Sequence, residues 1–192
     1  MVVAAEVPVW MTVDEFLNWD SEDGYRYELV DGEPRAMAPA STLHGFLQNE
    51  LGSLIRNHLR EKAPACEVVA NSGVIPRLLS EQNVRIPDLA VTCSQLAAGQ
   101  PTLPDPVLPI EILSPSNQAK TWTNVWAYTS IPSVREILVL RADRVAAELL
   151  RRSPESEWPD RPMSIGAGDL VLESIGFRVA LADLYARTGL GR

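Results

Sequence analysis

Two apolar segments of the chain each carry a single acidic residue. Asp88 lies within NVRIPDLAVTC (83–93), and Glu111 lies within PVLPIEILSPSNQ (106–118). Both segments are typical of buried strands. A lone carboxylate in such a strand is costly unless it is paired, protonated or bound to a metal. If the two strands are neighbours in one sheet, Asp88 and Glu111 converge at one end of that sheet.

Two converging carboxylates suit a hard divalent cation. Held close together in a low-dielectric site they repel each other, and one takes up a proton unless a cation neutralises the pair. Mg²⁺ prefers oxygen ligands and often uses only one or two carboxylates besides water and substrate phosphate. Such an ion polarises a phosphodiester and activates bound water. The alternative is structural, with each acid exposed to solvent or bonded to a neighbouring loop.

The elements that would position these acids follow from residue spacing and turn signals. Apolar residues at helical spacing predict a long helix over 41–63, capped by Ser41 or Thr42. The dipeptide Asp31-Gly32 predicts a tight hairpin turn. The other expected elements are helices near 13–19, 121–131 and 182–186, and strands within 66–79, 134–152, 170–172 and 177–179.

This order of elements predicts an α/β (α+β) fold, in which a mixed central β-sheet is flanked by helices. The chain has 192 residues, of which 46% are hydrophobic. That length and composition suit one domain with a sizeable core. No repeat or long linker divides the chain, so we expect a single domain over residues 1–192.

Charge and cysteine content limit the possible partners and compartments. The formal net charge is -8, so nucleic acid would be bound only through a local basic cluster, a metal, or both. Cys66 and Cys93 are too far apart for a C-x-x-C motif, and we expect buried free thiols. The chain has no evident signal peptide and no run near the ~20 apolar residues of a membrane span. We therefore expect a cytoplasmic protein without membrane association.

Several short motifs occur in a recognisable order. They are YELVDGE, a helix start with Ser41 and His44 at S-x-x-H spacing, RIPDLAV, PIEILSPS, a helix ending in Tyr128, and SVREILVL. Together they resemble the Uma2 family, also called DUF820, a set of bacterial restriction-endonuclease-like proteins. The resemblance covers residues 12–185 and implies a PD-(D/E)xK nuclease fold.

The resemblance also implies roles for particular residues. Pro87-Asp88 is similar to the PD of the motif, and the tripeptide 111–113, which begins with Glu111, is similar to (D/E)xK. The resemblance further implies that Glu28 is an additional acid near the site and that His44 lines it. Without the resemblance, Glu28 would be interpreted as an exposed hairpin residue, and His44 as a core or surface residue.

The lysine of the motif is missing at its usual positions. Leu113 stands two residues after Glu111, where a lysine side chain would share the face of the carboxylate. Asn124 stands where some relatives supply a lysine from the following helix. Lys120 is the nearest remaining candidate. It either reaches back to the site along its long stem or is a solvated surface side chain.

These observations predict a Mg²⁺-dependent (or Mn²⁺-dependent) DNA endonuclease with a degenerate PD-(D/E)xK site. Asp88 and Glu111 would bind the metal with help from Glu28, and Lys120 or His44 would position water. One alternative is a catalytically inactive binding or accessory protein that has kept the fold. Another is metal-dependent hydrolysis of a different substrate. A homodimer would suit a two-stranded substrate.

Overall fold

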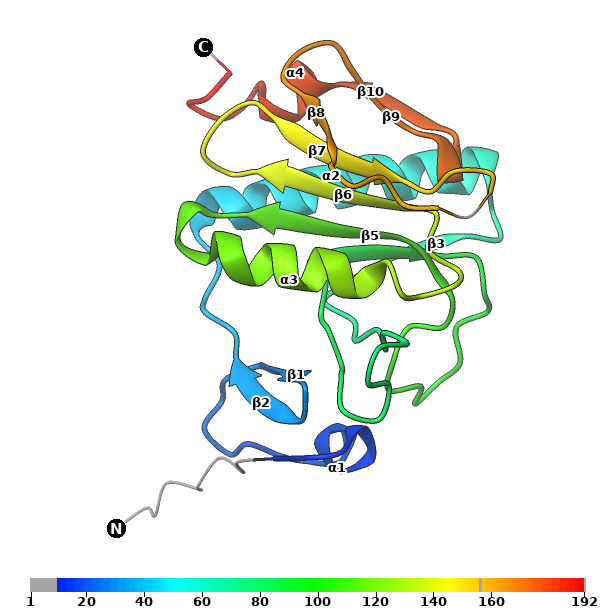
Figure 1. The fold of residues 1–192 in the computed structure, drawn as a ribbon. Helices are drawn as coiled ribbons and strands as arrows, with labels where there is room; N and C mark the ends of the chain where they lie inside the picture. Colours follow the sequence, from blue (N-terminus) through cyan, green and yellow to red (C-terminus); the bar gives the residue numbers. More distant parts are fainter. Residues whose placement is uncertain (1–9, 156, 192) are drawn as a thin grey trace.

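The computed structural model describes residues 10–155 and 157–191, and a six-stranded sheet forms its centre (Figure 1). In spatial order the strands are β3 (Glu67–Ala70), β4 (Leu89–Thr92), β5 (Pro106–Leu113), β6 (Glu136–Arg141), β7 (Ala147–Arg151) and β8 (Met163–Ile165). β5 and β6 are parallel, and every other neighbouring pair is antiparallel. The sheet is therefore mixed.

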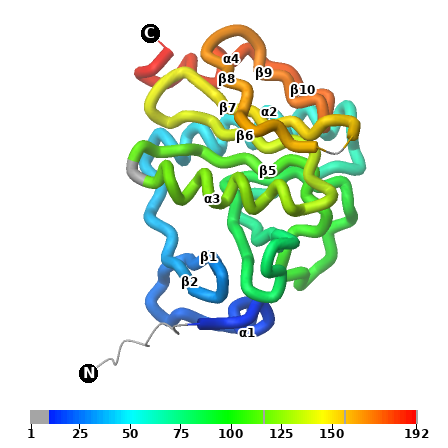
Figure 2. Tube along the Cα trace, in the orientation of Figure 1, coloured from blue at the N-terminus to red at the C-terminus, as the bar shows by residue number. Residues whose placement is uncertain are grey.

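Helices cover both faces of this sheet. In Figures 1 and 2, α3 (Gln118–Tyr128) lies in front of the sheet and α2 (Thr42–Lys62) lies behind it. α3 also connects β5 to β6, because a parallel pair needs a crossover connection. The remaining helices and strands are α1 (Val13–Leu17), β1 (Tyr27–Val30), β2 (Glu33–Ala36), β9 (Asp169–Leu172), β10 (Phe177–Ala180) and α4 (Leu181–Tyr185).

The two faces of β5 belong to two different cores. Ile110 and Ile112 are buried with the apolar side of α2, in a cluster that also includes α4 and the β9–β10 hairpin. Leu113 is buried on the opposite face with Val125 and Tyr128 of α3. Alternation along the strand therefore places Glu111 on the α3 face, together with Leu113.

A separate hairpin, β1–β2, lies beside α1 and away from the central sheet (Figure 1). Its turn has positive φ at both Asp31 (51°) and Gly32 (85°), the geometry that Asp-Gly favours in tight hairpins. Leu29 of β1 forms an isolated bridge with Val84, which attaches the hairpin to the segment before β4. A capping box between Thr12 and Glu15 begins α1.

The predicted fold class is confirmed, although some bounds differ. β4 begins only at Leu89, because Val84 and Arg85 pair with the hairpin and with Val74 rather than with β5. Pro87, which has no N–H to donate, precedes the strand. α3 begins at Gln118, earlier than the predicted 121, and β8 was not predicted. Among the described residues, no helix is long and apolar enough to cross a membrane.

The expectation of two buried free thiols is wrong. Cys66 and Cys93 form a disulfide, and Cys93 is exposed. The cause is the antiparallel register, in which Glu67 of β3 lies opposite Thr92 of β4, so the residues flanking these two face each other. The sequence separation of 27 residues conceals this contact. The disulfide links β3, which is an edge strand of the sheet, to β4.

We expect the disulfide to stabilise the fold measurably. Closing a loop of this length restricts the unfolded chain, so Cys93→Ser should lower the free energy of unfolding by about 2–4 kcal/mol. Urea denaturation with and without dithiothreitol measures this effect. The reductant should destabilise the wild type to the level of the variant and leave the variant unchanged. Equal stability of all four samples would contradict the prediction.

Candidate active site

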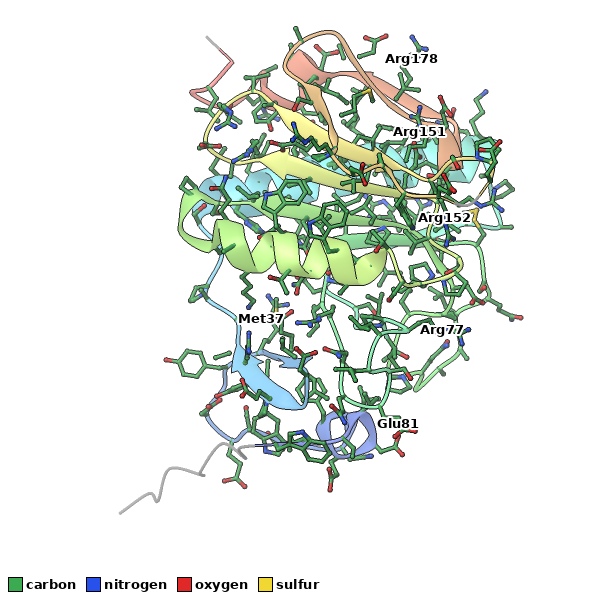
Figure 3. The ribbon with its side chains drawn as sticks, viewed as in Figure 1. Met37, Arg77, Glu81, Arg151, Arg152 and Arg178 are labelled. Atoms are coloured by element: carbon green, nitrogen blue, oxygen red, sulfur yellow. A yellow bond between two sulfur atoms is a disulfide. The ribbon has the colours of Figure 1, made fainter. Side chains whose placement is uncertain are left out.

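One cleft, about 430 Å³ in volume, contains all of the side chains for which the sequence predicts chemistry. Its walls come from β1, the segment 36–41, the start of α2, the ends of β4 and β5, and the first turns of α3. In Figure 3, Met37 of this lining lies in the gap between β2 and α3. The predicted residues that line the cleft are Glu28, His44, Asp88, Glu111 and Lys120.

Asp88 is fixed at the junction of β4 and β5. Leu89 pairs with Ile110 in the antiparallel ladder, so the next positions, Asp88 and Glu111, are adjacent at the end of β4. The Asp88 carboxylate continues the ladder with its side chain, because its Oδ2 accepts a hydrogen bond from the backbone N–H of Ile112 at 2.6 Å. The two strands thus bring both acids to the same end of the sheet, as the sequence predicts.

The first turns of α2 hold Asp88 from the other side. His44 Nε2 lies 2.8 Å from Asp88 Oδ1, and Gln48 Nε2 donates to the Asp88 carbonyl oxygen at 2.7 Å. His44 and Gln48 are four residues apart and therefore lie on one face of the helix. The Ser41 hydroxyl caps this helix by accepting from the His44 N–H. His44 is thus buried in the cleft wall and contacts one of the two central acids.

Glu111 is almost fully buried and has a different set of contacts. Its Oε1 accepts a hydrogen bond from the Tyr128 hydroxyl of α3 at 2.6 Å. Burial raises the pKa of the Glu111 carboxyl well above its usual value, the negative charge of Asp88 raises it further, and the bond from Tyr128 opposes the shift. Burial also raises the pKa of Tyr128, so the phenol keeps the proton that it donates.

Lys120 enters the cleft from the first turn of α3. The chain contains only two lysines, Lys62 and Lys120. Lys120 Nζ lies 2.9 Å from Oε1 of Glu28, a carboxylate with no solvent exposure, while Lys120 itself is 38% exposed. Asn124 donates to the other Glu28 oxygen at 3.0 Å. Lys120 is therefore a partly exposed cation held at the cleft by a buried acid from the hairpin.

Comparison with known proteins agrees with the fold described above. The model of the Uma2 family, described as "Putative restriction endonuclease", matches residues 13–182. The chain belongs to the Uma2 family. It is 28% identical over 178 residues to the "Uncharacterized protein slr1290" of Synechocystis sp. (strain ATCC 27184 / PCC 6803 / Kazusa), covering 91% of each chain.

A solved structure shares the fold of this Uma2 chain. It is titled as a putative nuclease belonging to DUF820 from Anabaena variabilis ATCC 29413. The two chains superpose with a TM-score of 0.72 over 92% of this chain and 98% of that one. Their sequence identity is 19%, so the similarity concerns the fold alone.

The donor set of this Uma2 chain fits a metal held by two carboxylates rather than three. Asp88 and Glu111 lie side by side at the cleft, which is enough for Mg²⁺ together with water and substrate oxygens. Within residues 10–155 and 157–191, no group of three or more His, Cys, Asp or Glu side chains is arranged to hold a metal. Glu28, the expected third ligand, instead contacts Lys120 and Asn124.

Two further residues near the site, Leu113 and Arg85, are buried. Leu113 is fully buried in the core beneath α3 and so provides no polar group to the cleft. Arg85 is also buried, and burial lowers the pKa of its guanidinium while the charges of Glu28 and Asp31 oppose that shift. This second cation close to Glu28 has no signal in the sequence. Gln48, by contrast, could have been found from its helical spacing to His44.

We expect Glu111→Gln to stabilise the protein in EDTA. The folded-state pKa of Glu111 is raised, so its contribution to stability is full below the unfolded pKa and is lost as pH rises through the folded pKa. The neutral amide avoids this loss. At pH 8 the variant should gain about 1–3 kcal/mol in free energy of unfolding.

Urea denaturation between pH 4 and pH 9 measures the difference. The gain should shrink towards acid pH, where Glu111 is protonated in both states. Glu67→Gln, at an exposed carboxylate on β3, is the control and should change little. A variant less stable than the wild type throughout would contradict the prediction.

Proposed function

We propose that this Uma2 chain is a Mg²⁺-dependent (or Mn²⁺-dependent) DNA endonuclease. The observation that carries the proposal is the placement of two adjacent carboxylates, Asp88 and Glu111, in the same cleft as the Lys120 ammonium. Two acids suit a cation with several open coordination positions, and a nearby ammonium suits the negative charge of a phosphodiester. The family description and the fold of the DUF820 structure agree with this class of reaction.

Asp88 and Glu111 would hold the metal, each kept in place by the rest of the fold. The bond from the Ile112 N–H fixes Asp88 Oδ2, and the Tyr128 hydroxyl fixes Glu111 Oε1. When bound, the metal would polarise the phosphodiester and lower the pKa of a coordinated water. It would also offset the repulsion between the two carboxylates, which otherwise favours the protonated form of Glu111.

Lys120 would replace the lysine that the strand lacks at Leu113. Its ammonium is partly exposed in the cleft and could stabilise charge that develops on the phosphate or orient the attacking water. Glu28 would act as the buried counter-ion that positions Lys120, in place of the role of metal ligand. His44 contacts Asp88 and would orient that carboxylate as a metal ligand.

DNA is the favoured substrate despite the net charge of -8. A metal that bridges protein and phosphate reduces the number of basic contacts that binding requires, and each phosphate contact made by a basic side chain adds to the salt dependence of affinity. The homodimer expected for a two-stranded substrate remains a prediction, and gel filtration with light scattering would test it.

A plasmid-nicking assay tests the proposal. Wild-type protein should nick supercoiled plasmid in Mg²⁺ or Mn²⁺ and be inactive in EDTA. Asp88→Ala and Glu111→Ala should abolish nicking, because each removes one of the two carboxylates. Lys120→Ala should lower kcat by about 10²–10³-fold, the usual effect of losing one charge-stabilising group.

Lys62→Ala is the matched control, since it removes the other lysine at the exposed end of α2. It should retain full activity. Wild-type protein without metal-dependent nicking, or nicking unchanged in Asp88→Ala, would refute the nuclease assignment.

The second candidate function is a non-catalytic binding or accessory protein, and the apolar Leu113 at the lysine position favours it. The two functions separate in calorimetric titrations with Mg²⁺ and Mn²⁺. The nuclease should bind the ion and lose that binding in Glu111→Ala. Absence of binding, or binding indifferent to this substitution, would favour the accessory function.

A further inference from the structure

A second groove, of about 350 Å³, adjoins the catalytic cleft. Gln48 and Asn71 line both cavities, so these two residues lie where the groove meets the cleft. It runs between α2 and the edge of the sheet formed by β3 and Leu89. None of the roles assigned above to the acids or to Lys120 uses this surface.

The lining of the groove differs in charge from the protein as a whole. On α2 it consists of positions 45, 48, 49, 52, 53 and 56, which share one face of the helix. Arg56 is the only charged residue among all the lining residues, and none is acidic, although the chain has 25 acidic and 17 basic residues. The groove lining therefore carries no negative charge that would repel a polyanion.

Arg56 is available to bind an anion. It is exposed, and its contact with the Ser53 hydroxyl, at 3.3 Å, is with a neutral group. Among the described residues it forms no ion pair with a carboxylate, unlike Arg141, Arg151 and Arg178. Its guanidinium keeps donors that can bind a phosphate in bidentate geometry.

Amide side chains lie at the junction of the groove with the cleft. Gln48 donates one hydrogen bond, to the Asp88 carbonyl oxygen, and within the described residues its side-chain oxygen accepts none. Asn71 adopts a left-handed backbone conformation with φ of 53°, and its side chain makes no hydrogen bond within the described residues. The Asn71 backbone N–H donates to the same Asp88 carbonyl oxygen at 3.1 Å. Polar groups with free bonding capacity therefore lead directly to a candidate metal ligand.

Glycine at position 45 keeps this junction open. A glycine inside a helix is unfavourable relative to alanine, and at Gly52 the approach of Leu89 accounts for it, since a Cβ would lie 3.3 Å from that side chain. At Gly45 a Cβ would meet nothing within 4 Å. Packing within the protein does not require Gly45, which leaves bare helix backbone for a ligand to approach.

We infer that this groove binds the DNA strand flanking the scissile phosphodiester, with Arg56 contacting a backbone phosphate. The inference rests on the proposed nuclease function and names where its substrate lies. Arg56 lies eleven positions after Gly45 along α2, a rise of about 16 Å. At 3.4 Å per nucleotide step this corresponds to about five nucleotides from the cleft.

Binding and cleavage are measured separately. Fluorescence anisotropy with a labelled 20-nucleotide DNA strand and the corresponding duplex, in Ca²⁺, reports binding without requiring catalysis. Arg56→Ala should weaken binding about tenfold and reduce the slope of log K against log salt by about 1, because one phosphate contact is lost. Arg60→Ala removes the same charge one helical turn away, outside the groove, and should change neither quantity.

Cleavage is compared on two substrates of different length. Arg56→Ala should lower kcat/KM on the oligonucleotide and leave it unchanged on thymidine 5′-(p-nitrophenyl phosphate), which reaches only the cleft. Gly45→Leu should also lower kcat/KM on the oligonucleotide and leave it unchanged on the small ester, because the leucine side chain fills the groove. The melting temperature of Gly45→Leu shows whether α2 tolerates the change.

The outcomes distinguish the groove assignment from the nuclease function. If Arg56→Ala behaves like Arg60→Ala in binding, the groove assignment is overturned even if plasmid is nicked. If binding depends on Arg56 but no substrate is cleaved, the groove stands and the nuclease function fails. If the small ester is cleaved but no oligonucleotide binds, the groove serves a different partner and the inference is wrong.

Discussion

The burial of three carboxylates in one cleft is the constraint on which the site depends. Glu28 has no solvent exposure, Glu111 is nearly buried, and Asp88 lines the same cavity. Their desolvation and mutual repulsion would destabilise the fold if each remained an unpaired anion. The fold meets this cost in a different way for each acid.

The three acids differ in their partners, because Asp88 accepts hydrogen bonds, Glu28 pairs with a lysine and an amide, and Glu111 accepts from a neutral hydroxyl. The carboxylate of Asp88 contacts the Ile112 N–H and His44. The carboxylate of Glu28 contacts Lys120 and Asn124. The Tyr128 hydroxyl that donates to Glu111 carries no charge, and burial together with the negative charge of Asp88 raises the pKa of the Glu111 carboxyl, so the site favours its protonated form. A binding site is the natural place for such residual electrostatic cost, since function often conflicts with stability.

Sequence reasoning reached the acids and the sheet, because both depend on local patterns. The apolar run around Glu111 predicted β5. The neighbouring strand, β4, brings Asp88 to the same end of the sheet. Contacts that join distant segments were harder to foresee. The disulfide of Cys66 depends on the register of β3 and β4, and the burial of Glu28 depends on how the hairpin docks through the bridge from Leu29 to Val84. Neither register nor docking leaves a periodic signal in the sequence.

The position of Lys120 follows from the packing of α3 on β5. The site two residues after Glu111 lies beneath that helix, where Leu113 packs against Val125 and Tyr128. An ammonium there would have to be desolvated within an apolar core. Placed on the first turn of α3, the lysine can reach the cleft and remain partly hydrated. That place is itself unfavourable for a cation, because a helix N-terminus carries partial positive charge. The buried carboxylate of Glu28 offsets this penalty, and so the acid from the hairpin and the cation on α3 depend on each other.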